Sequence, residues 1–224
     1  MNALASHYQQ KNLESQIRSA LEAALKNQQD FDPNIISAVD QFHIGGLQAT
    51  QDMLALAEFS ADGLILDIGC GIGGPARNIA QHCTNRVIGL DLSYDYCLAA
   101  NVISRQLNMS DQTGFIQANA VHLPFCDDSF NGIWTQHVSM NIEKKDLLFS
   151  EFSRVLKPAG KLVMYEVMNK TASLQAVTYP LPWSLDGNYS FLQNHKIYRQ
   201  LLEKNTFYIS QFNEVSQQAL KSVK

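Results

Sequence analysis

The sequence predicts an α/β fold in which a parallel sheet carries helices on both faces. Two observations predict it: apolar strand-like runs alternate with helical segments, and a glycine-rich turn joins the first such strand to the next helix. The length of 224 residues suits one good-sized domain. With 46% hydrophobic and 17% charged residues, the composition is typical of a globular protein.

Helices are expected before the sheet begins. Apolar residues follow helical spacing over about 13–29, and Asp32-Pro33 opens a second short helix, because proline suits a first helical turn. After the glycine break FHIGG (42–46), the stretch GLQATQDMLALAEF predicts a third helix that ends near Phe59. We therefore expect residues 1–60 to form an N-terminal helical cap.

From the first strand onward the chain alternates between strands and helices. Five strands are expected, at 63–69, 86–92, 113–119, 130–136 and 161–167. Helices are expected at 76–82, 94–107 and 145–156. Such alternation requires crossover connections, which place the strands parallel and the helices on both sheet faces.

The stretch 168–192 interrupts this alternation with prolines, a glycine and several aromatic residues, and it predicts a lid after the fifth strand. A helix at 193–204 and a sixth strand at about 206–212 are expected after the lid. Residues 61–224 should therefore form one structural unit together with the cap.

Composition excludes several classes of partner. The net charge of −4, without a basic stripe, argues against nucleic acid. No apolar stretch is long enough to span a bilayer, and the N-terminus lacks the pattern of a secretion signal. Without a C-x-x-C pair, the cysteines indicate no metal site, and each is expected to be a small buried hydrophobe. A cytoplasmic protein fits best. The cysteines are Cys70, Cys83, Cys97 and Cys126.

The glycine-rich turn LDIGCGIGG (66–74) predicts a ligand site. Gly69, Gly71 and Gly74 fit the pattern G-x-G-x-x-G between a strand and a helix, and such glycines let the backbone approach a ligand closely. Asp91 follows twenty residues after Gly71, at the end of the second strand, where a carboxylate would bind ribose hydroxyls.

Two ligands fit this arrangement, a nicotinamide dinucleotide and an adenosyl sulfonium. Asp67, at the end of the first strand, favours the sulfonium. Its carboxylate would repel a pyrophosphate, whereas it suits a ligand that carries an ammonium group and a sulfonium.

These motifs resemble those of class I S-adenosylmethionine (SAM) methyltransferases. LDIGCGIGG resembles the first motif of that family, and three further stretches resemble its later strand motifs in the right order. They are VIGLDLS (87–93), ANAVHLPFCDDSFNGIWTQ (118–136) and RVLKPAGKLVMYEV (154–167). The resemblance covers about residues 35–215. It implies a Rossmann-like sheet with strand order 3-2-1-4-5, a helical cap of the active site and SAM as cofactor.

Within this family, the motifs as a whole resemble small-molecule members, both sarcosine/dimethylglycine-like and ubiquinone-methyltransferase-like. The stretch FHIGGLQATQDML (42–54) is similar to the one before the first strand in methyltransferases of small amines, such as sarcosine/dimethylglycine and phosphoethanolamine enzymes. In such relatives this segment closes over the cofactor, and an N-terminal tyrosine, here Tyr8, covers the active site. The resemblance also implies individual roles: Gly69, Gly71 and Gly73 approach the methionine part of the cofactor. Asp67 orients its amino group.

Further roles are implied at the adenosine. Asp91 holds both ribose hydroxyls, Leu92 packs on the adenine, and Asn119 meets the adenine edge with the backbone of Ala120. The family usually has aspartate at position 119, so we expect somewhat weaker cofactor binding, because an amide is an uncharged acceptor. The complete set of expected cofactor-binding residues is Tyr8, His43, Ile44, Gly45, Asp67, Gly69, Cys70, Gly71, Gly73, Asp91, Leu92, Asn119, Ala120 and Gln136.

The catalytic candidates are His137 and Asn141, just after the fourth strand, together with Tyr8. His137 is either a base or orienting group for the acceptor, or a neutral histidine bonded within the local turn. Phosphoethanolamine enzymes carry a histidine at the position of Asn141, paired with the N-terminal tyrosine, so a phosphobase acceptor is disfavoured.

Aromatic residues of the fifth strand and the lid either form a box for a methylated ammonium or pack the lid on the sheet. They are Tyr165, Tyr179, Trp183, Tyr189 and Phe191. No arginine lies in the lid sequence to bind a substrate carboxylate, which weakens the case for sarcosine. The expected function is methylation of a small molecule, with an amine such as a glycine derivative as the first candidate. Alternatives are C- or O-methylation of a quinone or phenol, and a non-catalytic SAM-binding protein.

Relatives continue after the sixth strand with a seventh, antiparallel strand. The present sequence ends with EVSQQALKSVK (214–224), an amphipathic helical start, so we expect this strand to be missing. A poorly anchored sixth strand would then favour self-association, giving a homo-oligomer.

Overall fold

The computed structural model describes residues 40–41, 43–83, 86–170 and 177–222. Within these ranges all five strands run parallel in one sheet of order β3-β2-β1-β4-β5, which confirms the predicted Rossmann-like sheet. The strands are β1 (Leu64–Ile68), β2 (Arg86–Asp91), β3 (Thr113–Gln117), β4 (Phe130–Gln136) and β5 (Leu156–Tyr165). The helices are α4 (Gly46–Ala57), α5 (Gly74–Cys83), α6 (Tyr94–Gln106), η1 (Ser139–Asn141), α7 (Lys145–Val155), α8 (His195–Lys204) and α9 (Ser216–Ser222).

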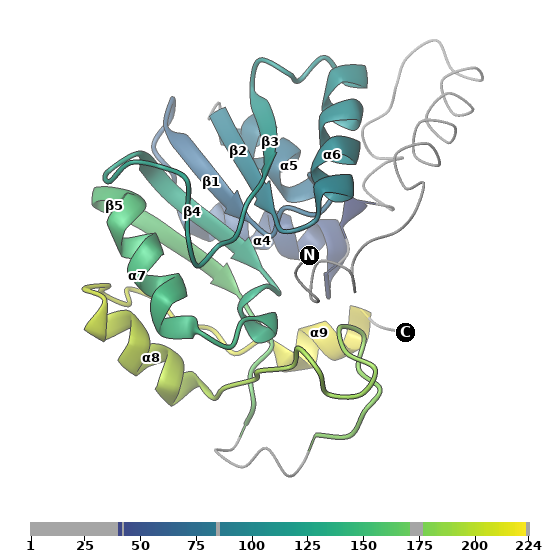
Figure 1. Ribbon diagram of the computed structural model, residues 1–224, viewed down its shortest axis with the longest axis vertical. Coiled ribbons are helices and arrows are strands. Elements are labelled where there is room, and N and C mark those ends of the chain that lie inside the picture. The colour runs from purple at the N-terminus through teal and green to yellow at the C-terminus, as the bar shows by residue number, and fades with distance from the viewer. Residues whose placement is uncertain (1–39, 42, 84–85, 171–176, 223–224) are drawn as a thin grey trace.

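The sheet lies between two layers of helices, as Figure 1 shows. Alternate residues of β1 point to opposite faces. Ile65 packs in a buried cluster with residues of α4, α5 and α6, whereas Leu66 and Ile68 pack in a second cluster with α7 and α8. Because both faces of the sheet are covered, its strands are almost continuously apolar.

The expected elements and the observed ones agree closely up to β4. The helices expected at 13–29 and after Asp32-Pro33 lie outside the described residues. β5 begins earlier than predicted, because pairing passes from Phe130–Leu156 to Gly132–Lys161 through an irregular stretch of β5. This bulge contains Ala159 with a positive φ of 63°.

The sixth strand predicted at about 206–212 is wrong: the described chain there forms no strand. Phe207 packs against the core, but Tyr208 is 91% exposed and Phe212 is 50% exposed. Apolar burial in this stretch is therefore too small to order a paired strand. No strand of the described residues pairs with the far edge of β5, and self-association stays a prediction.

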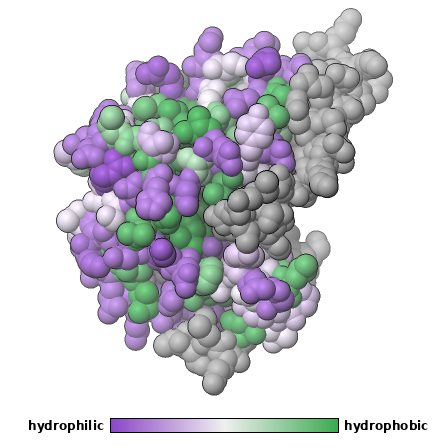
Figure 2. Space-filling view, viewed as in Figure 1, coloured by the Kyte–Doolittle hydropathy of each residue, from purple (hydrophilic) through white to green (hydrophobic). Residues whose placement is uncertain are grey.

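Figure 2 shows several hydrophobic patches on this face, in its upper middle and near its centre, with hydrophilic residues between and around them. Among the cysteines, Cys70 and Cys97 are buried and Cys83 is half-buried. The expectation of a buried side chain is wrong for Cys126, which is exposed in the loop between β3 and β4.

None of the described helices is long and apolar enough to cross a membrane.

Candidate active site

The glycine turn after β1 adopts the conformation that its residues predict. Gly69, Gly71 and Gly73 have positive φ values of 70°, 53° and 87°, which side-chain-bearing residues rarely adopt. A Cβ on Gly69 would lie 2.2 Å from a methyl carbon of Val138, whereas a Cβ on Gly71 would meet no atom within 4 Å. Gly71 thus leaves open space above the turn, as close approach of a ligand requires.

Asp91 at the end of β2 is bonded directly to this turn. The backbone N–H of Gly71 donates to Asp91 Oδ2 at 3.0 Å, and the N–H of Ser93 donates to Oδ1 at 2.8 Å. Burial raises the pKa of Asp91, while these backbone bonds oppose the shift. A carboxylate has about four acceptor positions, so Asp91 retains capacity for hydroxyl donors.

Asp67 is more deeply buried, with 2% of its surface exposed. The N–H of Ala76 donates to its carboxylate, but Oδ2 finds no hydrogen-bond partner among the described residues. Burial, followed by the negative charge of Asp91, raises the pKa of Asp67 well above its ordinary value. An unpartnered buried carboxylate oxygen marks a place where a donor group or a positive charge is missing.

A buried ion pair supports the turn from behind. Arg77 of α5 donates through Nη2 to Asp40 Oδ2 and to the carbonyl of Ile72, both at 2.8 Å. Ile72 lies inside the turn, so the guanidinium connects the turn to the segment that precedes α4. Burial lowers the pKa of Arg77 and raises that of Asp40, and their mutual attraction opposes both shifts.

Two histidines and a tyrosine form the wall next to the end of β4. The rings of His137 and Tyr165 are 4.8 Å apart, and those of His137 and His43 are 6.2 Å apart at nearly a right angle. Burial, followed by repulsion from His43, lowers the pKa of His137 to about 4. Burial also lowers the pKa of His43. Both imidazoles are therefore neutral at pH 7.

Gln136 connects this wall to α4. Its Oε1 accepts from Trp134 Nε1 at 2.9 Å and from the buried Thr50 hydroxyl at 3.4 Å, whereas its Nε2 has no partner among the described residues. Thr50 also lies 3.1 Å from His43 Nε2, which in turn contacts the Gly46 carbonyl at 2.9 Å. The segment 43–50 is thereby held beside the end of β4.

The remaining predicted cofactor residues lie at the same edge of the sheet. Asn119 follows β3 and is exposed, and its Oδ1 already accepts from the N–H of Val121 at 3.1 Å. Ala120 is buried beside it, and Leu92 follows Asp91 directly. Four others lie next to residues already described: Ile44, Gly45, Cys70 and Gly73. Tyr8 lies outside the described residues.

The side chain of Asn141 contacts the lid. Its Nδ2 donates to the carbonyl of Tyr189 in the lid at 2.8 Å. Next to it, the N–H of Phe191 donates to the Met140 carbonyl at 2.7 Å, and Lys145 Nζ donates to the Phe191 carbonyl at 2.6 Å. Three hydrogen bonds therefore fasten lid residues 189–191 to η1 and the start of α7.

Sequence reasoning missed four polar residues of this region: Thr50, Arg77, Lys145 and Glu166. Glu166, directly after β5, accepts from backbone N–H groups of the turn that follows β4. The sequence does contain a signal for Glu166, namely a carboxylate inside the apolar run VMYEVM. Charged residues are seldom buried without a partner, so a partner for Glu166 could have been predicted.

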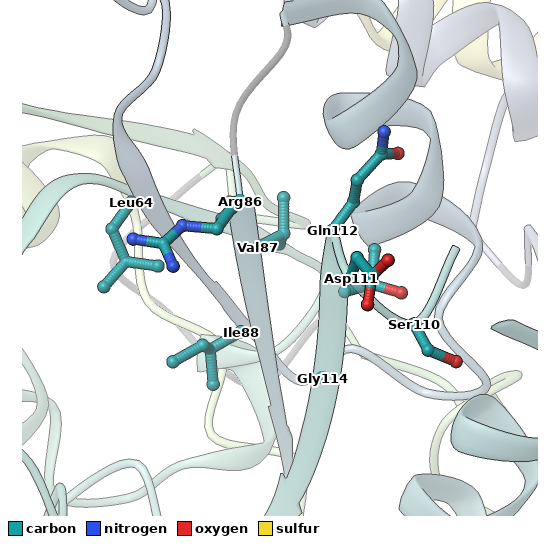
Figure 3. A pocket seen from close by; sticks show the side chains of 9 residues that line it. Leu64, Arg86, Val87, Ile88, Ser110, Asp111, Gln112 and Gly114 are labelled. Atoms are coloured by element: carbon teal, nitrogen blue, oxygen red, sulfur yellow. The ribbon is translucent and has the colours of Figure 1, made fainter. Parts of the chain in front are cut away.

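The site at the glycine turn is distinct from the open depression of about 260 Å³ shown in Figure 3. That depression lies at the opposite edge of the sheet, where Leu64, Arg86 and Thr113 begin β1, β2 and β3. In α/β sheets, ligands bind outside the carboxyl ends of the strands, so we place the functional site at the glycine turn.

Residues 66–164 match the family described as "Methyltransferase domain". This segment is a class I methyltransferase domain. Methyltransferase GfsG of Streptomyces halstedii is 31% identical over 132 residues, which cover 59% of this chain and 48% of GfsG. The sterol 24-C-methyltransferase of Saccharomyces cerevisiae is 36% identical over 104 residues, which cover 46% of this chain and 27% of that enzyme. The chain thus spans less than half the length of these curated relatives.

Among solved structures, the methyltransferase domain is similar to phosphoethanolamine N-methyltransferase 2 of Haemonchus contortus, solved in complex with SAM. The TM-score is 0.72 and the identity 22%, with 89% of this chain and 47% of that chain covered. At this identity the likeness shows the fold alone.

Proposed function

We propose that this methyltransferase domain binds SAM and transfers its methyl group to a small-molecule acceptor. The observation that carries the proposal is the pair of carboxylates beside the glycine turn. Asp67 presents a buried oxygen without a partner among the described residues, and Asp91 is bonded to the Gly71 N–H with acceptor capacity to spare. SAM carries an ammonium group and two ribose hydroxyls, which are the donors that these carboxylates lack.

Different residues of the chain are proposed to contact different parts of the cofactor. Asp67 accepts from the amino group, and Asp91 accepts from the ribose hydroxyls. Gly69 and Gly71 expose backbone to the methionine part, while Leu92 and Ala120 flank the adenine. When bound, SAM supplies an electrophilic methyl group on a sulfonium, and the task left to the protein is to position the acceptor in line with it.

His137 orients the acceptor in this proposal. With its pKa lowered to about 4, the neutral imidazole is too weak a base to take a proton efficiently at pH 7, but it can exchange hydrogen bonds. That property supports an acceptor that reacts in its uncharged form, and a neutral amine such as a glycine derivative is the first candidate. Asn141 is proposed to hold the lid, because its amide already donates to Tyr189.

A carbon or oxygen acceptor, such as a quinone or phenol, is the second candidate. The 36% identity to a sterol 24-C-methyltransferase supports it, since that relative's name states methylation at carbon. Residues 1–60 are proposed to cap the site, with Tyr8 covering the acceptor.

Transfer of labelled methyl from SAM to a panel of amines, quinones and phenols tests the proposal. For an amine acceptor, kcat/KM should rise with pH until the amine itself is deprotonated, whereas a carbon acceptor should give a flat profile. Tight SAM binding without any methylated product would favour the non-catalytic alternative. Calorimetry that detects no SAM binding would overturn the proposal.

A further inference from the structure

The turn that presents His137 has a left-handed backbone. His137 has a positive φ of 54°, a conformation that residues with a Cβ seldom adopt unless surrounding contacts impose it. Its own N–H donates to the carbonyl of Tyr165 at 2.8 Å. The turn then enters η1, whose first N–H groups have no partner within the helix.

Glu166 supplies the missing partner. Its Oε1 accepts from the N–H of Ser139 at 3.1 Å and from the N–H of Val138 at 3.4 Å. The end of β5 thus contacts three consecutive residues after β4: the Tyr165 carbonyl binds His137, and the Glu166 carboxylate binds the next two. Tyr165 also packs its ring against the His137 imidazole.

We propose that Glu166 is a positioning residue for His137, because its carboxylate fixes the left-handed turn that holds the imidazole between His43 and Tyr165. The inference rests on the proposed function, in which His137 orients the acceptor. Glu166 acts through the backbone of Val138 and Ser139, and it needs no contact with the acceptor.

A purely structural role explains Glu166 less well. Burial raises its pKa to about 7, and Oε2 has no partner among the described residues, so the carboxylate is costly in this position. An apolar side chain would fill the same space but would leave two buried N–H groups without an acceptor. The free-energy cost of burying the Glu166 carboxylate is explained if the turn at residues 137–139 must be held in one conformation.

The structure also offers a matched control. Tyr198 of α8 contacts the same turn through the side chain of Ser139, where its hydroxyl lies 2.5 Å from Ser139 Oγ. Tyr198→Phe removes a buried hydrogen bond at this turn but leaves both backbone bonds to Glu166 intact. It therefore separates general loosening of the region from release of the His137 turn.

The experiment compares Glu166→Gln, Glu166→Ala and Tyr198→Phe with wild type. Glutamine keeps a carbonyl oxygen that can accept both N–H groups, so kcat should stay within about threefold of wild type. Alanine should lower kcat at least about tenfold and leave the Kd for SAM within about threefold. Tyr198→Phe should behave like the glutamine variant. Equal losses of kcat in Glu166→Ala and Tyr198→Phe would overturn the proposal.

A second readout does not depend on turnover. The imidazole resonances of His137, assigned by NMR through their loss in His137→Gln, should shift or broaden in Glu166→Ala and keep their positions in Glu166→Gln and Tyr198→Phe. Unchanged resonances in Glu166→Ala would refute the positioning role. If Glu166→Ala does not fold, Glu166→Asp serves instead, because the shorter side chain withdraws the acceptor and should shift the same resonances. Failure of the wild type to methylate any acceptor would sink the proposed function while this NMR test still decides the role of Glu166.

Discussion

Asp91→Asn is the sharpest test of the cofactor site, because it changes one oxygen and little volume. The wild-type carboxylate accepts from Gly71 N–H at 3.0 Å and from Ser93 N–H at 2.8 Å, and in the proposed complex it also accepts from two ribose hydroxyls. Asparagine keeps one carbonyl oxygen and replaces the other by an NH₂ group, which donates. At least one backbone or ribose donor must then lose its acceptor.

The magnitude follows from the number of charged hydrogen bonds that are lost. Each contributes about 1.5–3 kcal/mol, and about 1.4 kcal/mol corresponds to a tenfold change in Kd. We therefore expect SAM affinity to fall about tenfold to a hundredfold. Stability should change by less than about 1 kcal/mol, because removing the Asp91 charge also relieves its repulsion of the buried Asp67. Asp91→Ala should weaken SAM binding further, since it releases the Gly71 N–H as well.

Isothermal titration calorimetry with SAM measures the affinity, and urea denaturation measures the stability. Asp111→Asn is the control, because Asp111 is exposed in the depression at the opposite edge of the sheet. It should leave SAM affinity unchanged. An Asp91→Asn protein that is folded and binds SAM within about twofold of wild type would refute the assignment of Asp91 to the ribose.

Three further predictions concern turnover, pH and the support of the glycine turn. His137→Ala should lower kcat at least about tenfold and leave SAM affinity within about threefold by calorimetry; equal turnover would leave His137 a packing residue. The pKa of Glu166 rises from an ordinary 4.5 to about 7 on folding, so the folded protein binds the Glu166 proton more tightly than the unfolded chain does. The contribution of Glu166 to the free energy of unfolding should therefore fall by up to about 3 kcal/mol as the pH rises from 4.5 to 7. Urea titrations across this range should show a steeper loss in wild type than in Glu166→Gln, and parallel curves would contradict the assigned pKa. Asp40→Asn leaves Arg77 buried without a charged partner and should destabilise the fold by about 3–5 kcal/mol, whereas Asp146→Asn, in an exposed ion pair, should leave the denaturation midpoint unchanged.

The sheet could be predicted from the sequence because its signals are local. Apolar runs predict the individual strands, and crossover rules predict that these strands run parallel. The strand order follows from the resemblance to class I SAM methyltransferases, and the observed sheet has this order. The stretch 206–212 carries the same local signal, Phe-Tyr-Ile-Ser-Gln-Phe, but forms no strand. Strand formation there depends on a partner edge and on burial, and neither is a property of the segment itself.

The positions of the candidate cofactor residues could be predicted from the sequence, whereas the contacts around His137 and Asn141 could not. Asp67 is the second-last residue of β1 and Asp91 is the last residue of β2, so their positions follow directly from the sheet. The hydrogen bond between the Ser139 N–H and Glu166 joins residues 27 positions apart in the sequence, and the one from Asn141 to Tyr189 joins residues 48 positions apart. Such contacts depend on how the lid and the ends of β4 and β5 pack, and no periodicity or spacing encodes that.

The electrostatics of the two sides support one division of labour. On the cofactor side, burial and then the negative charge of Asp91 raise the pKa of Asp67, so a cationic group bound beside Asp67 offsets this repulsion. On the acceptor side, burial keeps His43 and His137 neutral, so no fixed positive charge of these rings opposes the sulfonium. A neutral imidazole has one nitrogen that donates a hydrogen bond and one that accepts. In the proposed reaction neither imidazole acts as a base, so rate enhancement depends on positioning the acceptor. The left-handed turn at His137, which Glu166 holds through backbone hydrogen bonds, then fixes the position of the group proposed to orient the acceptor.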